Sequence, residues 1–367
     1  MKIKKIIAMS TVAGVALAGL AFSSASAEPV SNSYVLVGSD TLQDSTNALL
    51  NGTNATGSTV RVTTLTGTTV GSFDAFGSAA IQTKPNGPFF GRPAGSSAGV
   101  NALRASIKGS DYSGNTSVAV KPIVGQVDIA RSSSAPSGVD ATNGKLSYIP
   151  YARDAVGYAY KGGTAAWANI PAATLKQIFD GTLSTFDGVA IKPRLPQTGS
   201  GTRNFFLGAL GYSGTTAPGV TDVAGVPAEN DATVLAEGEI IPFSSASWVA
   251  QANRVSGTNT TTAERVAFGS PIAGVAAFTG TVPSLVPNSA YYGNASFGRD
   301  TYLVVEFARI NPTDAAYDAN LAALVNPNVS TSLTSYGAFA TTPGAVKTKF
   351  GFLAPSSPTP IRAVTTL

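Results

Sequence analysis

Apolar and β-branched runs alternate along this chain with helix-like segments. The strand-like runs cover residues 34–37, 118–120, 127–130, 155–160 and 302–307. The helix-like segments cover residues 42–50, 100–107, 172–179, 204–210, 246–253 and 315–324. Tracts rich in Asn, Ser, Thr and Gly at 51–60, 109–117 and 255–262 indicate surface loops between them. Strands that alternate with helices predict an α/β fold.

Three short turns rich in Gly, Ser and Thr precede predicted helices, at residues 38–41, 95–99 and 199–202. Each turn offers free backbone N–H groups at a helix start, small side chains that permit close approach, and hydroxyl donors. Helix N-termini carry partial positive charge and bind anions. If the three turns converge, they form a cage of neutral donors for an oxyanion.

Simple helix capping is the alternative explanation for each turn. Ser, Thr and Asp are preferred caps and contribute roughly 1 kcal/mol each. The same residues can serve as caps and as anion ligands, so the two interpretations remain open for every single turn.

The length and composition indicate the number of domains and the charge of the surface. The chain has 367 residues, which is enough for two domains of ordinary size. Hydrophobic residues make up 43% and charged residues only 12%, so we expect large cores and a weakly charged surface.

The first 27 residues have the pattern of a secretory signal peptide. Lysines at positions 2, 4 and 5 precede an apolar run that ends in Ala25-Ser26-Ala27, a small-residue cleavage site. A membrane anchor is the alternative. Removal of this segment lowers the net charge from +4 to +1, so the charge gives no indication of nucleic-acid binding. We expect a secreted or cell-wall-associated protein.

Missing residue types exclude several chemistries. The chain has no His and no Cys, which rules out Ser-His-Asp triads, thiol nucleophiles and zinc sites built on His or Cys. It also rules out disulfides and a Cys-linked lipid anchor. Gly144-Lys145 is followed by Leu146, so no Walker-type phosphate loop is present. Carboxylate hydrolases, Ser-Lys pairs and oxygen-ligated metals stay open, but no motif supports them, and we expect no enzyme activity, cofactor or metal.

Three motifs carry a resemblance to a known family. They are Gly-Ser-Ser-Ala-Gly-Val at 95–100, Val-Asp-Ile-Ala-Arg-Ser-Ser-Ser-Ala-Pro at 127–136 and Gly-Ser-Gly-Thr at 199–202. In order and spacing they resemble the phosphate-binding proteins of ABC phosphate importers. Segments 150–156 and 175–181 look like this family's first interlobe strand and the helix and turn after it. The resemblance runs from about residue 34 to about 255 and is closest to versions from Gram-positive actinobacteria.

The resemblance implies a two-lobed α/β fold of the periplasmic-binding-protein type (type II-like), with the ligand in a cleft between lobes joined by crossover strands. We expect residues 28–150 and 300–367 to form one lobe and residues 151–299 the other.

The resemblance also implies a set of phosphate-binding residues on these motifs. Carried over, they are Ser39, Asp40, Thr41, Leu42, Ser96, Arg131, Ser133, Ser134, Arg194, Gly199, Ser200, Gly201 and Thr202. Family members use an Arg a few residues before Gly-Ser-Gly-Thr, but Arg194 is six residues before Ser200, farther than usual. Arg131 and Arg203 are rival cations, and each of the three can instead be a structural ion-pair partner.

One position departs from the family pattern. The family places an Asp before Ala-Pro in the second motif, where it accepts the proton of hydrogen phosphate and repels sulfate; here that position is Ser134. Either Asp40 supplies the acceptor, or the site takes a fully ionised oxyanion such as sulfate.

The sequence therefore predicts a monomeric solute-binding protein that captures inorganic phosphate for an ABC permease or for scavenging. A sulfate-like oxyanion is the alternative ligand. A secreted structural or adhesive protein on the same fold, and a carboxylate-type hydrolase, are the competing functions.

Overall fold

The computed structural model describes residues 30–367 except 69, 222–226 and 338–341. The predicted signal peptide, residues 1–27, lies outside the described residues. Within the described part, no helix is both long and apolar enough to cross a bilayer.

A mixed sheet forms the centre of the molecule. Its strands are β1 (Val35–Gly38), β2 (Gly71–Ser72), β7 (Ile129–Ser132), β8 (Leu146–Lys161), β11 (Lys192–Pro193), β12 (Glu239–Ser244), β13 (Val266–Gly269), β16 (Gly298–Glu306) and β17 (Ile361–Ala363). They follow the order β11-β12-β8-β16-β7-β1-β2, and β13 and β17 also pair with β8. The predicted α/β class is confirmed.

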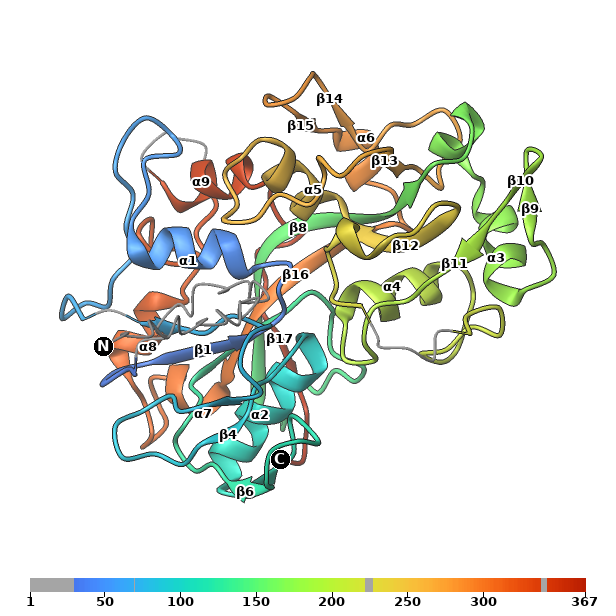
Figure 1. The fold of residues 1–367 in the computed structure, drawn as a ribbon. Coiled ribbons are helices and arrows are strands. Elements are labelled where there is room, and N and C mark those ends of the chain that lie inside the picture. The colour runs from blue at the N-terminus through green and yellow to red at the C-terminus, as the bar shows by residue number, and fades with distance from the viewer. Residues whose placement is uncertain (1–29, 69, 222–226, 338–341) are drawn as a thin grey trace, which may run out of the picture.

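Helices and four small hairpins surround this sheet (Figure 1). The helices are α1 (Gln43–Asn51), α2 (Ser96–Lys108), α3 (Ala172–Asp180), α4 (Gly201–Ala209), α5 (Ser245–Ala252), α6 (Ser289–Tyr292), α7 (Phe307–Ile310), α8 (Ala319–Leu324) and α9 (Pro343–Lys349), with 3₁₀ turns at Ala165–Asn169 and Ala232–Val234. The hairpins pair β3 (Ala80–Ile81) with β4 (Phe90–Gly91), β5 (Asp111–Tyr112) with β6 (Lys121–Pro122), β9 (Thr185–Phe186) with β10 (Val189–Ala190), and β14 (Phe278–Thr279) with β15 (Val286–Pro287).

Two long strands join the two halves of the molecule. The first half of β8 pairs with β16 and β17, and its second half pairs with β12 and β13. In Figure 1, β8 and β16 run side by side through the centre of the molecule. Both predicted lobe boundaries, near residues 150 and 300, fall within these strands.

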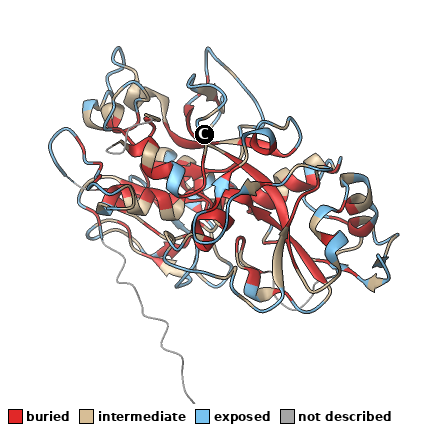
Figure 2. Ribbon diagram, turned by 90° about the horizontal axis from the view of Figure 1, so that it is seen from above, coloured by how far each residue is buried: buried red, intermediate tan, exposed pale blue. Residues whose placement is uncertain are grey.

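Separate hydrophobic cores lie on either side of this connection. One pair of clusters packs around β1, β7 and the first half of β8, and another pair packs around β12 and the second half of β8. Figure 2 shows the buried ribbon concentrated in the sheet and the exposed ribbon in the peripheral loops. The molecule therefore has two lobes that share β8 and β16.

β8 is longer than predicted, because the apolar pattern covered 155–160 and the family resemblance 150–156, whereas the strand begins at Leu146. Pro150 lies within β8 and has no N–H to donate. The pairing with β16 shifts register at this point, between Thr301 and Tyr302, which accommodates the proline as a bulge.

Two element predictions were wrong. Residues 118–120 form a turn and coil instead of a strand, because Val120 is exposed and has no apolar surface to pack against. The helix predicted over 315–324 begins only at Ala319, where the Asp318 carboxylate caps it by accepting a hydrogen bond from the Leu321 amide.

Candidate functional site

The three predicted turns meet between the lobes. The Ser97 amide of the second turn donates to the Gly199 carbonyl of the third at 3.4 Å. A Cβ atom added to Gly95 would lie 2.5 Å from the same carbonyl oxygen, so only glycine permits this approach. The first turn joins them through Thr41, whose hydroxyl lies 3.5 Å from that of Thr202. The N-termini of α1, α2 and α4 therefore converge.

The capping alternative holds for one of the three helices. The Ser200 hydroxyl accepts a hydrogen bond from the Arg203 amide at 3.0 Å and caps α4. The N-cap residues of α1 and α2 are Leu42 and Gly95, and neither provides a side-chain cap. Side-chain capping by the N-cap residue therefore does not account for the turns before α1 and α2.

A group of serine hydroxyls lies against the start of α4. Ser96 Oγ accepts from the Ser133 amide at 2.9 Å and lies 3.1 Å from Ser133 Oγ. A Cβ atom on Gly201 would collide with Ser96 Oγ and Ser133 Oγ and would lie 3.0 Å from Ser134 Oγ. The structure thus brings the three sequence motifs, at 95–100, 127–136 and 199–202, together at Gly201.

The cation nearest to these hydroxyls is Arg299, which the sequence analysis did not select. Its guanidinium group donates to Thr202 Oγ1 at 2.8 Å and reaches Thr41 Oγ1 at 3.5 Å. The side chain is only 2% exposed, and its Nη1 has no hydrogen-bond partner among the described residues. Arg299 is the second residue of β16, whereas the predicted strand began at Tyr302. The sequence feature that could have indicated Arg299 is an arginine just before the apolar strand.

Asp154 fixes the direction of this guanidinium group. Its fully buried carboxylate accepts from Arg299 Nε at 3.1 Å and Nη2 at 2.8 Å. The same carboxylate accepts from Ser244 Oγ and from the Ala246 amide at the start of α5. Asp154 lies on β8, so the joining strands orient Arg299 towards the threonine pair.

The three arginines considered from the sequence point elsewhere. Arg131 donates to the carbonyls of Gly38, Ser39 and Phe73 and to Ser72 Oγ, and burial lowers its pKa to about 10. Arg194 donates to the Val234 carbonyl and pairs with Glu239 at 3.3 Å. Arg203 donates to the carbonyls of Pro196 and Thr215. All three brace loops through these contacts.

The first turn also carries a carboxyl group close to the convergence. Asp40 Oδ2 accepts a hydrogen bond from Asn230 Nδ2 at 3.0 Å. Glu229, which precedes Asn230, accepts at 3.4 Å from the hydroxyl of Thr41, which follows Asp40. Burial, followed by the charge of Glu229, raises the pKa of Asp40 well above its usual range. Ser39 Oγ is buried with no hydrogen-bond partner among the described residues. The sequence analysis missed Glu229 and Asn230, which lie in a segment with no regular pattern.

We call the convergent group the oxyanion cage and define it by Ser39, Thr41, Ser96, Ser133, Ser134, Ser200, Gly201, Thr202 and Arg299. A pocket of about 380 Å³ adjoins it and is lined by Ser133, Ser134, Ala135, Asn204, Phe205, Arg299, Asp300 and Tyr302. Within the described part of the chain, no three acidic side chains gather as potential metal ligands.

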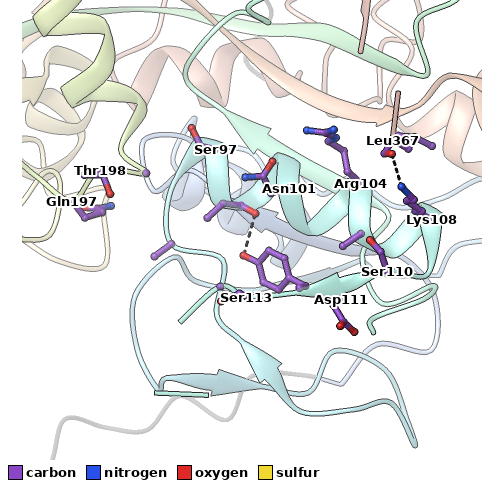
Figure 3. Close-up of a pocket in the computed structure, with 16 residues that line it drawn as sticks. Ser97, Asn101, Arg104, Lys108, Ser110, Asp111, Ser113, Gln197, Thr198 and Leu367 are labelled. Atoms are coloured by element: carbon purple, nitrogen blue, oxygen red, sulfur yellow. Dashed lines mark hydrogen bonds between the residues drawn. The ribbon is translucent and has the colours of Figure 1, made fainter. Parts of the chain in front are cut away.

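A larger pocket of about 820 Å³ lies beside the cage (Figure 3). α2 lines it with Ser97, Asn101, Arg104 and Lys108, and the loop at Gln197 and Thr198 faces them from the other lobe. Arg104 donates to the Thr366 carbonyl and Lys108 to Leu367, each at 3.1 Å. Arg104 Nε and Gln197 Nε2 are buried with no hydrogen-bond partner among the described residues, so unpaired buried donors occur in this pocket as well as in the cage.

Known structures share this fold. The chain is similar to an ABC-type phosphate transport receptor from Vibrio cholerae, with 15% identity, a TM-score of 0.50, and coverage of 88% of this chain and 100% of that chain. It is also similar to a human phosphate binding apolipoprotein, with 16% identity, a TM-score of 0.47, and coverage of 88% and 92%. The chain has the two-lobed fold of the Vibrio receptor. No protein-family model matches the sequence, and no curated protein matches it significantly.

Proposed function

We propose that this chain is an extracytoplasmic solute-binding protein that captures inorganic phosphate in the oxyanion cage. The observation that carries the proposal is the pair of buried donors without partners, Arg299 Nη1 and Ser39 Oγ, at the convergence of three helix N-termini. Buried polar groups in folded proteins are nearly always hydrogen-bonded. Two unpaired donors beside Thr41 and Thr202 therefore call for a ligand rich in acceptors.

The cage chemistry suits a tetrahedral oxyanion. The guanidinium group of Arg299 offers a planar fork that matches two oxygens of one anion. Hydroxyls of Thr41, Ser96, Ser133 and Thr202 and the positive ends of the α1, α2 and α4 helix dipoles favour an anion without further charge. Because Asp154 already balances Arg299, most of the selectivity for the anion comes from directed neutral donors.

Phosphate is favoured over sulfate by the carboxyl groups next to the cage. Asp40 and Glu229 add negative charge near the site, which disfavours a ligand that cannot offer a proton. Hydrogen phosphate carries a proton that it can donate to an acceptor, whereas sulfate is fully ionised. Asp40 and Glu229 together thus provide the proton-accepting carboxylate that Ser134 cannot provide.

Ligand entry requires the lobes to separate. Ser39, Thr41, Ser96, Ser133, Thr202 and Arg299 are all buried. We propose that the lobes are residues 28–150 with 300–367, and 151–299, and that they hinge at β8 and β16. A ligand that contacts both lobes stabilises the closed form in proportion to its preference for that form.

The proposal includes a transport or scavenging role without catalysis. The cage serines have no neighbouring histidine or lysine to act as a base, since the chain has no His and the cage contains no Lys. We propose delivery of phosphate to an ABC permease, or scavenging away from the membrane, by a secreted monomer.

Isothermal titration calorimetry tests this function. The purified protein is unfolded and refolded to remove bound ligand, then titrated with phosphate and, in parallel, with sulfate. We expect micromolar or tighter binding of phosphate and none of sulfate. At 100 times its dissociation constant the ligand adds about 2.7 kcal/mol of stability, which a rise in Tm reports. Binding of sulfate alone would reassign the ligand, and silence from both anions would favour a structural or adhesive role.

A further inference from the structure

Asp40 and Glu229 come from opposite sides of the cleft. Asp40 follows β1 in the first lobe. Glu229 precedes Asn230, whose side-chain oxygen accepts from the Ser244 amide and whose carbonyl accepts from Gln251 of α5. Ser244 ends β12, which pairs with the second half of β8. The approach of the two carboxyl groups is therefore a contact between lobes.

The local backbone holds this contact in place. Asn230 has a φ of 57°, in the left-handed region that asparagine tolerates better than most residues. In this conformation its side-chain nitrogen, Nδ2, donates a hydrogen bond to Asp40 Oδ2 at 3.0 Å. Glu229 Oε1 accepts from Thr41 Oγ1 at 3.4 Å, so both residues contact the first turn of the cage.

One oxygen on each carboxyl group is left without a partner. Asp40 Oδ1 and Glu229 Oε2 are both buried, and neither has a hydrogen-bond partner among the described residues. Two ionised carboxylates in this position would repel each other in a medium of low polarity. A single proton between the two groups removes the repulsion and supplies both unpaired oxygens with a hydrogen bond.

The surrounding charges do not remove the need for this proton. Glu229 and Asp44 are the acidic groups that act on Asp40, and Arg131 is the cation that faces it. Arg299 reaches the same Thr41 hydroxyl as Glu229, but its charge is matched by Asp154. Burial, followed by the charge of Glu229, raises the pKa of Asp40.

We propose that Glu229 is a positioning residue of the oxyanion cage: it shares one proton with Asp40 across the cleft, and this shared proton holds the lobes closed over the anion. The proposal rests on the phosphate-binding function proposed above. In the open form both carboxyl groups face water and ionise at their ordinary pH, so closure takes up one proton from solvent. Phosphate affinity then falls by up to tenfold for each pH unit above the ordinary carboxyl range, until the shared proton is lost.

Glu229→Gln separates this effect from the ligand's own ionisation. The glutamine amide can donate to Asp40 without a proton from solvent. Titrations at pH 7 in buffers of different ionisation enthalpy give the number of protons taken up when phosphate binds. We expect the wild type to take up about one proton more than Glu229→Gln. Because phosphate titrates equally in both, its own contribution cancels.

The control is Glu237→Gln, which alters an exposed glutamate paired with Arg265. It should keep the wild-type proton count and pH profile. Equal counts in wild type and Glu229→Gln, with both binding phosphate, overturn the shared proton and leave the function intact. Failure of the wild type to bind phosphate overturns the function itself.

Asp40→Asn provides a second test, because it removes the other carboxyl and should also abolish the extra proton. Should neither variant bind, wild-type titrations at pH 8, above the second ionisation of phosphate, decide the matter. Uptake near one proton then supports the shared proton, and no uptake overturns it.

Discussion

Arg299 donates a hydrogen bond to Thr202, which lies 97 residues earlier in the sequence. Arg299 lies on a joining strand and is oriented by Asp154 of the other joining strand. Thr202 lies in the first turn of α4, where the helix dipole is positive. The contact therefore ties the hinge strands directly to the end of a helix that faces the cage.

Replacing Arg299 should weaken phosphate binding strongly. Hydrogen bonds to charged groups contribute about 1.5–3 kcal/mol, so Arg299→Gln should raise the Kd roughly 10- to 100-fold. Arg299→Lys keeps the charge but loses the fork, and should give an intermediate Kd. Calorimetry measures both, and circular dichroism confirms that each variant is folded.

Arg265→Lys is the matched control for the arginine variants. Arg265 is more than half exposed and pairs with Glu237 at 2.8 Å. Neither residue belongs to the cage. Its Kd should equal that of the wild type. An unchanged Kd in Arg299→Gln would remove Arg299 from the site.

Gly201→Ala should block closure of the cleft. The new methyl group would occupy the space of Ser96 Oγ and Ser133 Oγ, which belong to the opposite side of the cage. Phosphate affinity should fall at least tenfold, because the start of α4 can no longer come close to the serine hydroxyls. The thermal stability of the ligand-free protein should change little.

Gly208→Ala in the same helix is the control for this variant. A Cβ atom at Gly208 meets nothing within 4 Å, and alanine favours helix over glycine by roughly 0.5–1 kcal/mol. We expect a slightly higher Tm and unchanged affinity. Equal affinities for both alanine variants would show that the tight contact at Gly201 has no role in binding.

The three turns of the cage could be predicted because their signal is local. Gly, Ser and Thr at a strand-to-helix junction identify a helix start whatever the rest of the chain does. We predicted that the turns converge because the same turn pattern occurs three times and because of the family resemblance. In the structure, Gly95 lies against Gly199, so two of the turns are in direct contact.

Arg299 and Glu229 could not be found in this way, since each depends on contacts between distant segments. Arg299 reaches the cage only because β16 inserts between β7 and β8. Glu229 lies in an irregular segment that Ser244 and Gln251 hold through Asn230. The start of β8 at residues 146–149 was also not predicted, and the strand runs on through Pro150 because of the bulge with β16.

Asp154→Asn should make the protein less stable but more responsive to phosphate. Breaking a buried ion pair by removing one partner costs about 3–5 kcal/mol, because the charge of Arg299 is left uncompensated. A bound anion restores that compensation. Thermal melts with and without phosphate should therefore show a larger gain in Tm for Asp154→Asn than for the wild type.

Asp318→Asn tests whether this response is specific. Asp318 pairs with Arg309 at 2.9 Å and lines neither the cage nor the pocket that adjoins it. Its gain in Tm with phosphate should match that of the wild type. If Asp154→Asn gains no more than the wild type, Arg299 does not use its charge on the ligand.

Lys347 should make stability depend on pH independently of phosphate. Its ammonium group is fully buried on α9, donates to the carbonyls of Tyr151 and Ser335, and has no acidic partner among the hydrogen bonds and ion pairs of the described residues. Burial lowers its pKa well below the usual value. The unfolded chain then binds more protons than the folded one, so stability rises with pH between the folded and unfolded pKa values, by at most about 1.4 kcal/mol per unit.

Lys347→Met should remove this slope, and Lys349→Met on the same helix should not, because Lys349 is exposed. Denaturant unfolding at a series of pH values from 7 to 9.5 measures the slope below the range in which the tyrosines titrate. Above that range the buried tyrosines, whose pKa values are raised by burial, act in the opposite direction. A wild-type slope that survives in Lys347→Met would mean that the ammonium group keeps its proton in the folded protein at every pH tested.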